Sequence, residues 1–297
     1  MSSLESFISY LSLEKNYSQH TVMAYQSDIE AFDIFCLNEF ETTTIDNVSY
    51  AEIRSWIVAL VNNDISNRSI NRKVASLKAY YRFLQRIEVI ENSPLTKHKA
   101  LKTSKKIEVP FSEFEMQNVL QQITFENDFE GQRDKLMIEL LYATGIRRAE
   151  LINLKLHDVD LNRNIIRVLG KRNKERIVPL LNTTKITFQD YLDERENLES
   201  INDERHIFLL KTGYKLYETL VYRVINKYLS EVSSKVKKSP HVLRHTFATH
   251  MLNKGADLNS VKELLGHSSL ASTQVYTHNS IAELKKVHLA AHPRNKK

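Results

Sequence analysis

The stretch RDKLMIELLYATG, residues 133–145, predicts the central element of the fold. Apolar side chains fill most of its positions from Leu136 onward, which indicates a compact helix that is buried on nearly all sides. Gly145 ends this helix, because glycine readily adopts the left-handed conformation found at helix C-termini. The residues that follow, RRAELINLK at 147–155, predict the start of another helix.

Two short apolar segments come next, NIIRVLG at 164–170 and ERIVPL at 175–180. Their separation by KRNK predicts a β-hairpin. Most of the remaining sequence reads as helices bounded by glycine, proline or polar residues, which we expect at 184–197, 217–232, 241–254, 257–265 and 281–291. Residues 110–297 are therefore predicted to form one mostly α domain with a small antiparallel sheet.

Residues 1–92 predict a separate helical bundle. Val22, Ile29 and Phe32 share one stripe of an expected helix, and Ile70 and Leu77 share a stripe of another. The helical pattern stops at the sequence Asn-Ser-Pro, residues 92–94, because the residue before a proline is biased out of the helical conformation. The segment KHKALKTSKK that follows, residues 97–106, holds five lysines and no acidic residue. It predicts an exposed basic linker, which we place at residues 93–109.

Composition narrows the function. The 297-residue chain has a net charge of +6, divided unevenly: residues 1–97 hold 9 Lys and Arg against 12 Asp and Glu, and residues 98–297 hold 33 against 24. A basic second domain indicates an acidic partner such as nucleic acid, although a merely soluble basic surface has the same composition. The lone cysteine, Cys36, excludes an internal disulfide and fits a reducing compartment. Since the sequence shows neither a secretory signal nor an apolar run long enough to span a membrane, we expect a cytoplasmic protein.

One group of cationic residues is arranged to bind a phosphate. His241 and Arg244 share a helix face at i and i+3, directly after the helix start at Ser239-Pro240. A second arginine is expected in the first turn of the helix that follows Gly145. Two arginines can each grip two oxygens of one phosphate, which lysine cannot do. Periodicity does not decide between Arg147 and Arg148, which point about 100° apart on a helix.

Several histidines also have interpretations other than catalysis. The spacing of His241, His245 and His250 is also typical of metal ligands, but without a cysteine or a well-placed carboxylate to complete the set we expect no metal. We interpret His245 as a packing or supporting residue. His278 and His292 are expected to be solvated near the end of the chain.

The motifs taken together resemble the tyrosine site-specific recombinases, the phage integrase family. The resemblance rests on LLYATGIRRAELINL, VLGKRNKERIVPL, HVLRHTFATHML and LLGHSSLASTQVYTH, which occur in the family's order and spacing. YSQHTVMAYQSDIEAF and SINRKVASLKAYYRFL resemble the family's SAM-like, DNA-clamping helical domain, so the likeness covers nearly the whole chain. It is strongest to the Xer-type branch, which resolves chromosome dimers. The opening PFSEFEM departs from the usual Leu-Pro start of the family's catalytic domain.

The resemblance implies a metal-free reaction with no cofactor, in which a tyrosine hydroxyl attacks a DNA phosphodiester and forms a 3′-phosphotyrosyl link. It implies that Tyr276 is the nucleophile, that Lys171 protonates the leaving 5′-oxygen and that His241 accepts the tyrosine proton. Glu150 is expected to orient an arginine or a histidine. The full catalytic set implied is Arg147, Lys171, His241, Arg244, His267 and Tyr276, which selects Arg147 over Arg148.

The resemblance also implies a C-shaped clamp around duplex DNA and a homo- or hetero-tetramer on two recombination sites. The helix at 281–291 is expected to dock into a neighbouring protomer, and a septal DNA translocase is a candidate activator. Candidate DNA contacts are Arg68, Arg72, Lys73, Arg172 and Lys174, with Arg176 expected to make a non-specific phosphate contact. Rival interpretations are a mobile-element integrase or DNA invertase, a type IB topoisomerase, and a non-catalytic helical DNA-binding regulator.

Overall fold

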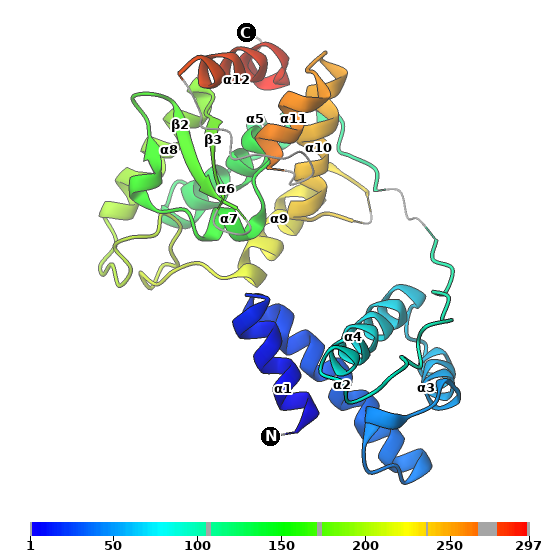
Figure 1. Ribbon diagram of the computed structural model, residues 1–297. Helices are drawn as coiled ribbons and strands as arrows, with labels where there is room; N and C mark the ends of the chain where they lie inside the picture. The colour runs from blue at the N-terminus through cyan, green and yellow to red at the C-terminus, as the bar shows by residue number, and fades with distance from the viewer. Residues whose placement is uncertain (1, 105–107, 171–173, 236, 267–277, 296–297) are drawn as a thin grey trace. The chain divides into compact units, whose positions relative to one another are not determined.

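The computed structural model describes residues 2–104, 108–170, 174–235, 237–266 and 278–295. The chain divides into two compact units, Met1–Lys106 and Ile107–Lys297. Figure 1 shows that the first is built from helices and that the second combines helices with a small sheet. The division falls inside the segment that the sequence predicts as a linker.

The first unit is a helical bundle, as expected. It contains α1 (Ser3–Ser9), a π-helical turn (Tyr10–Glu14), α2 (Gln19–Phe40), α3 (Tyr50–Asn62) and α4 (Asn67–Arg86). Serine side chains cap the N-termini of all four α-helices, which explains where each begins. A core of aromatic and aliphatic side chains, including Phe7, Phe32, Trp56 and Tyr81, joins them.

Part of the predicted linker packs against this first unit. Leu95 is fully buried in its core. The side chain of Asn71 donates to the carbonyl of Leu101 and accepts from its N–H, both at 2.9 Å. The lysines at 97, 99 and 102 remain exposed. The backbone of this stretch is therefore tied down, while its charges face solvent.

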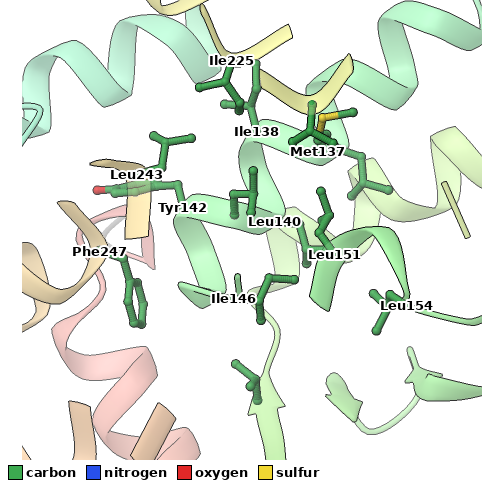
Figure 2. Packing of buried hydrophobic residues seen from close by; sticks show 14 of the residues in the cluster. Met137, Ile138, Leu140, Tyr142, Ile146, Leu151, Leu154, Ile225, Leu243 and Phe247 are labelled. Carbon is green, nitrogen blue, oxygen red and sulfur yellow. The ribbon is translucent and has the colours of Figure 1, made fainter. Parts of the chain in front are cut away.

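The second unit is organised around the predicted buried helix, α6 (Phe129–Thr144), whose residues are buried almost without interruption. Figure 2 shows Met137, Ile138, Leu140 and Tyr142 of α6 packed among apolar side chains from the surrounding elements. These elements are α5 (Glu113–Gln121), α7 (Arg148–Ile152), α8 (Asn182–Glu196), α9 (Glu218–Val232), α10 (Pro240–Asn253), α11 (Leu258–Leu265) and α12 (His278–Ala291). Two short 3-10 turns, Leu156–Asp158 and Pro293–Asn295, complete the helical inventory of the described residues in this unit.

Gly145 ends α6 in the left-handed conformation, with φ at 62°. A Cβ at this position would lie 2.4 Å from Cδ1 of the buried Phe247 ring. Glycine is therefore required both by the backbone and by the close approach of α10. This turn leads directly to the candidate arginines.

The sheet has three antiparallel strands in the order β1 (Val159–Asp160), β2 (Ile165–Leu169) and β3 (Glu175–Pro179). The β2–β3 pair confirms the predicted hairpin, with Leu169 opposite Glu175 and Ile166 opposite Val178. β1 was not predicted, because two residues are too few to show alternation. In the described parts of the chain, no helix combines the length and the apolar character that a membrane span needs.

Two histidines near the C-terminus, His288 and His292, are packed rather than solvated. His288 is fully buried and lies 2.7 Å from the carbonyl oxygen of Ala143. His292 is 1% exposed, and its ring lies 3.4 Å from the carbonyl oxygen of Tyr142. The expectation of a solvated His292 is wrong because both rings satisfy carbonyls in the last turn of α6, which helix geometry leaves unpaired. The side chain of His278 lies outside the described residues.

The burial of these histidines makes stability depend on pH. Burial lowers the pKa of His288 from 6.5 to about 4, although its hydrogen bond to Ala143 opposes the change. Burial, and then the charge of His288, lower the pKa of His292 well below its ordinary value. Between about pH 6.5 and 4 the unfolded chain therefore binds more protons than the folded chain, so the free energy of unfolding decreases as the pH falls.

At about pH 5, His288 alone should cost about 2 kcal/mol of stability relative to neutral pH. Urea unfolding near neutral pH and at about pH 5 measures the difference. In His288→Gln, which carries no titrating ring, the difference between the two conditions should shrink by about this amount. An unchanged difference would show that His288 is not held neutral in the fold.

Candidate active site

The two candidate arginines meet at one turn of the second unit. Arg147 precedes α7 in an extended conformation, with φ −76° and ψ 153°. It therefore stands just before the first helical turn, whereas the sequence predicts it within that turn. Its backbone N–H and its Nη1 donate to the two carboxylate oxygens of Glu150, each at 2.7 Å. Arg148 points elsewhere and pairs with Glu218 on α9, so the two neighbouring arginines have separate roles.

Arg244 projects from α10 toward the same turn. Its Nη1 donates to the carbonyl of Gly145 at 2.6 Å, and its Nη2 donates to the carbonyl of Leu265 at 2.7 Å. Burial, and then the positive charge of Arg147, lower the pKa of Arg244 to about 10. Arg244 is thus charged at neutral pH, and its guanidinium and that of Arg147 bind the adjacent carbonyls of Leu265 and Gly266.

Glu150 links Arg147 to a third arginine, Arg176. The guanidinium of Arg176 donates to both oxygens of Glu150, at 2.9 and 2.8 Å, and the two side chains are each 5% exposed. Burial raises the pKa of Glu150, but the hydrogen bonds and charge of Arg176 and the bonds from Arg147 outweigh it, so the pKa is lowered. Glu150 therefore orients an arginine, as expected.

The expectation that Arg176 contacts phosphate is wrong. Its side chain is buried between β3 and α11, where Nη1 and Nη2 donate to Glu150 and Nε donates to the carbonyl of Leu264 at 2.8 Å. A signal for this was present in the sequence. Residues two apart on a strand share a face, so Arg176 was to be expected on the same side as the buried Val178.

The three arginines share one anchor, the C-terminal end of α11. The last carbonyls of a helix lack partners within the helix and carry a partial negative charge. Here consecutive carbonyls each accept from a different arginine. Arg176 binds Leu264, Arg244 binds Leu265, and Nη2 of Arg147 binds Gly266 at 3.3 Å. This places a dense positive charge beside the residue that precedes His267.

His241 lies in the first turn of α10, and its side chain is 78% exposed. Its Nδ1 is 2.9 Å from Oε2 of Glu108, which also pairs with Lys237. His245, on the same helix, is exposed, which contradicts its interpretation as a packing residue. His250 is buried, with Nδ1 at 2.9 Å from the Tyr142 hydroxyl and Nε2 at 2.9 Å from the Phe111 carbonyl.

The other predicted catalytic residues, Lys171, His267 and Tyr276, lie outside the described residues, as does Arg172. Their sequence neighbours are placed. Gly170 donates to the Lys174 carbonyl at 2.8 Å at the end of the hairpin, and Lys174 is exposed. Gly266 stands at the arginine anchor, and α12 begins at His278.

The predicted DNA contacts of the first unit lie on α4. Arg68 is exposed. Arg72 and Lys73 both bind Asp28, Arg72 with its two terminal nitrogens at 2.5 and 2.9 Å and Lys73 at 3.1 Å. The Arg72 side chain remains 54% exposed, whereas that of Lys73 is 20% exposed. Asp28 thus holds Arg72 in a fixed orientation at the surface of the bundle.

Helical spacing extends this face beyond the predicted residues. An α-helix turns 100° per residue, so four arginines and two alanines of α4 fall within roughly 80° of arc. They form one arginine face with the two small residues at its middle. The face comprises Arg68, Arg72, Ala75, Ala79, Arg82 and Arg86. Arg82 and Arg86 are not among the named candidate DNA contacts, although the same helical spacing indicates them.

The described residues include no group of three or more histidines, cysteines or carboxylates that could hold a metal ion. A hollow of about 300 Å³ lies over the sheet, lined by residues such as Arg163 and Arg167, and does not include Arg147 or Arg244. Arg147 and Arg244, which are oriented at this helix end, can bind and stabilise a negatively charged phosphoryl group through charge and hydrogen bonds.

The chain is similar to known proteins over both of its units. The phage integrase family matches residues 118–283, and the phage integrase N-terminal SAM-like domain matches residues 4–88. A tyrosine recombinase XerC of Oceanobacillus iheyensis is 41% identical, over 98% of this chain and 96% of the relative. Another, from Anoxybacillus flavithermus, is 40% identical over 98% and 97%.

Two solved structures share the fold. A XerH site-specific recombinase bound to a palindromic difH substrate has a TM-score of 0.72 at 23% identity, covering 96% of this chain and 83% of that one. The Tn1549 transposon integrase in complex with transposon right end DNA has a TM-score of 0.70 at 20% identity, covering 96% and 99%. The family match and the XerC relatives identify an enzyme that breaks and rejoins DNA strands. The chain belongs to the phage integrase family, the tyrosine recombinases.

Removing the Glu150 carboxylate should lower the free energy of unfolding far more than removing an exposed ion pair does. Glu150→Ala leaves Arg176 buried without its counter-charge, so the free energy of unfolding should fall by about 3–5 kcal/mol. Arg148→Ala breaks the exposed pair with Glu218 and should cost about 1 kcal/mol or less. Urea denaturation of both variants measures the contrast, and equal losses would contradict the structural role assigned to Glu150.

Proposed function

We propose that the protein resolves chromosome dimers at cell division by site-specific recombination. The observation that supports the proposed chemistry is the arginine site, where Arg147 and Arg244 supply two oriented guanidinium groups for one phosphate. The assignment to chromosome dimers, and so to chromosome partition, is supported by relatives called XerC that match over nearly their full length. It also agrees with the Xer-type resemblance of the motifs.

In the proposed first step, the Tyr276 hydroxyl attacks the scissile phosphorus while His241 accepts its proton. A bond forms between the tyrosine oxygen and phosphorus, and the bond from phosphorus to the 5′-oxygen breaks. Lys171 gives a proton to that leaving oxygen. The 5′-hydroxyl of a second strand then reverses the step, so the phosphoryl bond energy is kept and neither ATP nor metal is needed.

Arg147 and Arg244 stabilise the negative charge that develops on the non-bridging oxygens. Their donors are already held by Glu150, Gly145 and the end of α11, so little reorganisation is required during the reaction. His267 is proposed to hydrogen-bond the same phosphate. Each arginine is expected to contribute roughly 10²–10³ in rate, by analogy with other preorganised oxyanion donors.

DNA binding is proposed to use both units. The arginine face of α4 would contact phosphates through its ends, and its two alanines would permit close approach to the duplex. Arg172 and Lys174 of the hairpin would add contacts from the catalytic unit. We propose boundaries of 1–92 for the clamp domain, 93–109 for the linker and 110–297 for the catalytic domain.

The proposed active assembly is a tetramer, of this chain alone or with a paralogue, on two DNA sites in the cytoplasm. In the single chain, α12 packs against α10, α11 and β3 of its own unit. Docking of α12 into a neighbour would require it to leave this seat. Activation by a septal translocase is part of the same proposal.

Recombination in vitro tests the biological role. The protein should recombine two copies of the terminus-region site of its host chromosome. Recombination confined to the ends of a mobile element would favour an integrase or invertase. Relaxation of supercoiled DNA without partner exchange would favour a type IB topoisomerase.

The nucleophile is tested by Tyr276→Phe. The variant loses one hydroxyl, so its DNA affinity should stay within about threefold of the parent, but the covalent adduct on a nicked suicide substrate should disappear. Gel electrophoresis of denatured samples detects the adduct. Adduct formation by the variant would transfer the role to another tyrosine, such as Tyr222, whose side chain is exposed.

The role of Lys171 is tested by changing the leaving group. An alkoxide needs a proton in the transition state, whereas a thiolate leaves well without one. Lys171→Ala should therefore be slower by roughly 10²–10⁴ on ordinary DNA and largely recover on DNA with a 5′-bridging sulfur. Arg147→Ala, whose target is the non-bridging oxygens, should not recover. Equal recovery of both would mean that Lys171 only neutralises charge.

A further inference from the structure

A carboxylate from the start of the second unit contacts the proposed proton acceptor. Oε2 of Glu108 lies 2.9 Å from Nδ1 of His241, although the two residues are 133 positions apart. The Glu108 side chain is 24% exposed, while the His241 side chain is 78% exposed. The imidazole is therefore held on one edge by Glu108.

Glu108 is itself held in place. Its other oxygen, Oε1, pairs with Lys237 in the segment that leads into α10. The hydrogen bond from Lys237 lowers the pKa of Glu108, burial raises it by less, and the contact with His241 lowers it further. The carboxylate is thus ionised at neutral pH and acts as an acceptor.

This geometry determines which nitrogen carries the proton in a neutral imidazole. An ionised carboxylate only accepts hydrogen bonds, so Nδ1 must be the protonated nitrogen. Nε2 then has the free lone pair that a general base requires. The same arrangement of carboxylate and imidazole fixes ring orientation and tautomer in hydrolytic and metal sites.

We propose that Glu108 is a positioning residue for the recombination chemistry, holding His241 as the Nδ1–H tautomer so that Nε2 accepts the Tyr276 proton. This proposal rests on the proposed function of His241. Glu108 lies just before the PFSEFEM segment, where the sequence departs from the family's usual Leu-Pro opening. It was not among the predicted site residues.

The kinetic test uses Glu108→Ala and single-turnover cleavage of a suicide substrate. The cleavage rate should fall by about 10–100-fold, as for other partners that orient a reactive imidazole. DNA affinity should stay within about threefold, because Glu108 supplies no positive charge for phosphate. Glu108→Gln keeps an oxygen that can accept from Nδ1, so it should recover part of the lost rate.

Glu113→Ala is the matched control. Glu113 lies on the same segment, at the start of α5, and its carboxylate pairs with Lys254 at 2.8 Å instead of with His241. Its removal deletes an equal charge and an exposed ion pair, so the cleavage rate should change by no more than about twofold. A loss equal to that of Glu108→Ala would overturn the proposal, because a general charge effect would then explain both.

The tautomer itself is measured without relying on activity. Long-range ¹⁵N–¹H spectra of the histidine rings, recorded above the histidine titration range, should show Nδ1–H for His241 in the parent protein and a shift toward Nε2–H in Glu108→Ala. An Nε2–H form in the parent would overturn the proposal. So would an unchanged cleavage rate in Glu108→Ala, or a loss of rate that parallels a loss of DNA affinity.

The experiments distinguish failure of the proposed function from failure of the Glu108 role. If the parent protein forms no covalent adduct, the proposed function fails, whatever the ring spectra show. If the parent forms adduct but the spectra or the variant rates disagree with expectation, only the role of Glu108 fails.

Discussion

The arginine site depends on the capping of one helix end. Three consecutive carbonyls at the C-terminus of α11 accept hydrogen bonds from three different arginines. The negative end of the helix and the carboxylate of Glu150 together offset the repulsion among the guanidinium groups. Arg176 is buried in its ion pair with Glu150, whereas Arg147 and Arg244 stay partly exposed. Arg176 thus orients Glu150, which holds Arg147, while backbone carbonyls hold Arg244. Such preorganised charge favours a transition state because it needs little rearrangement as charge develops.

The last turn of α6 connects the arginine site to the end of the chain. His288 and His292 of the C-terminal region lie against the carbonyls of Ala143 and Tyr142, and Arg244 donates to Gly145 a few residues later. The glycine turn is thus held from two sides by different parts of the chain. Tyr276 precedes α12 by two positions. The helix that follows the proposed nucleophile therefore packs, through His288, against the turn that leads to Arg147.

Local signals in the sequence were sufficient to predict most of the elements and the chemical class. Apolar periodicity, glycine stops and the KRNK turn are local signals, so the buried helix at α6, the β2–β3 hairpin and the helical first unit were all predictable. The ordered motifs identified the recombinase family, and with it the choice of Arg147 over Arg148. Lys171, His267 and Tyr276 remain predictions from that resemblance.

The tertiary contacts determine which charged groups are buried or paired inside the protein and which remain available to bind substrate. Arg176 was expected at the DNA and is buried, His292 was expected in solvent and is buried, and Glu108 was passed over but contacts His241. Each of these outcomes depends on partners far away in the chain, such as the 133 positions between Glu108 and His241. Local sequence patterns report the face on which a side chain lies. They do not report the carboxylate or carbonyl that another element brings to it, and that partner decides whether a charge is structural or free to act.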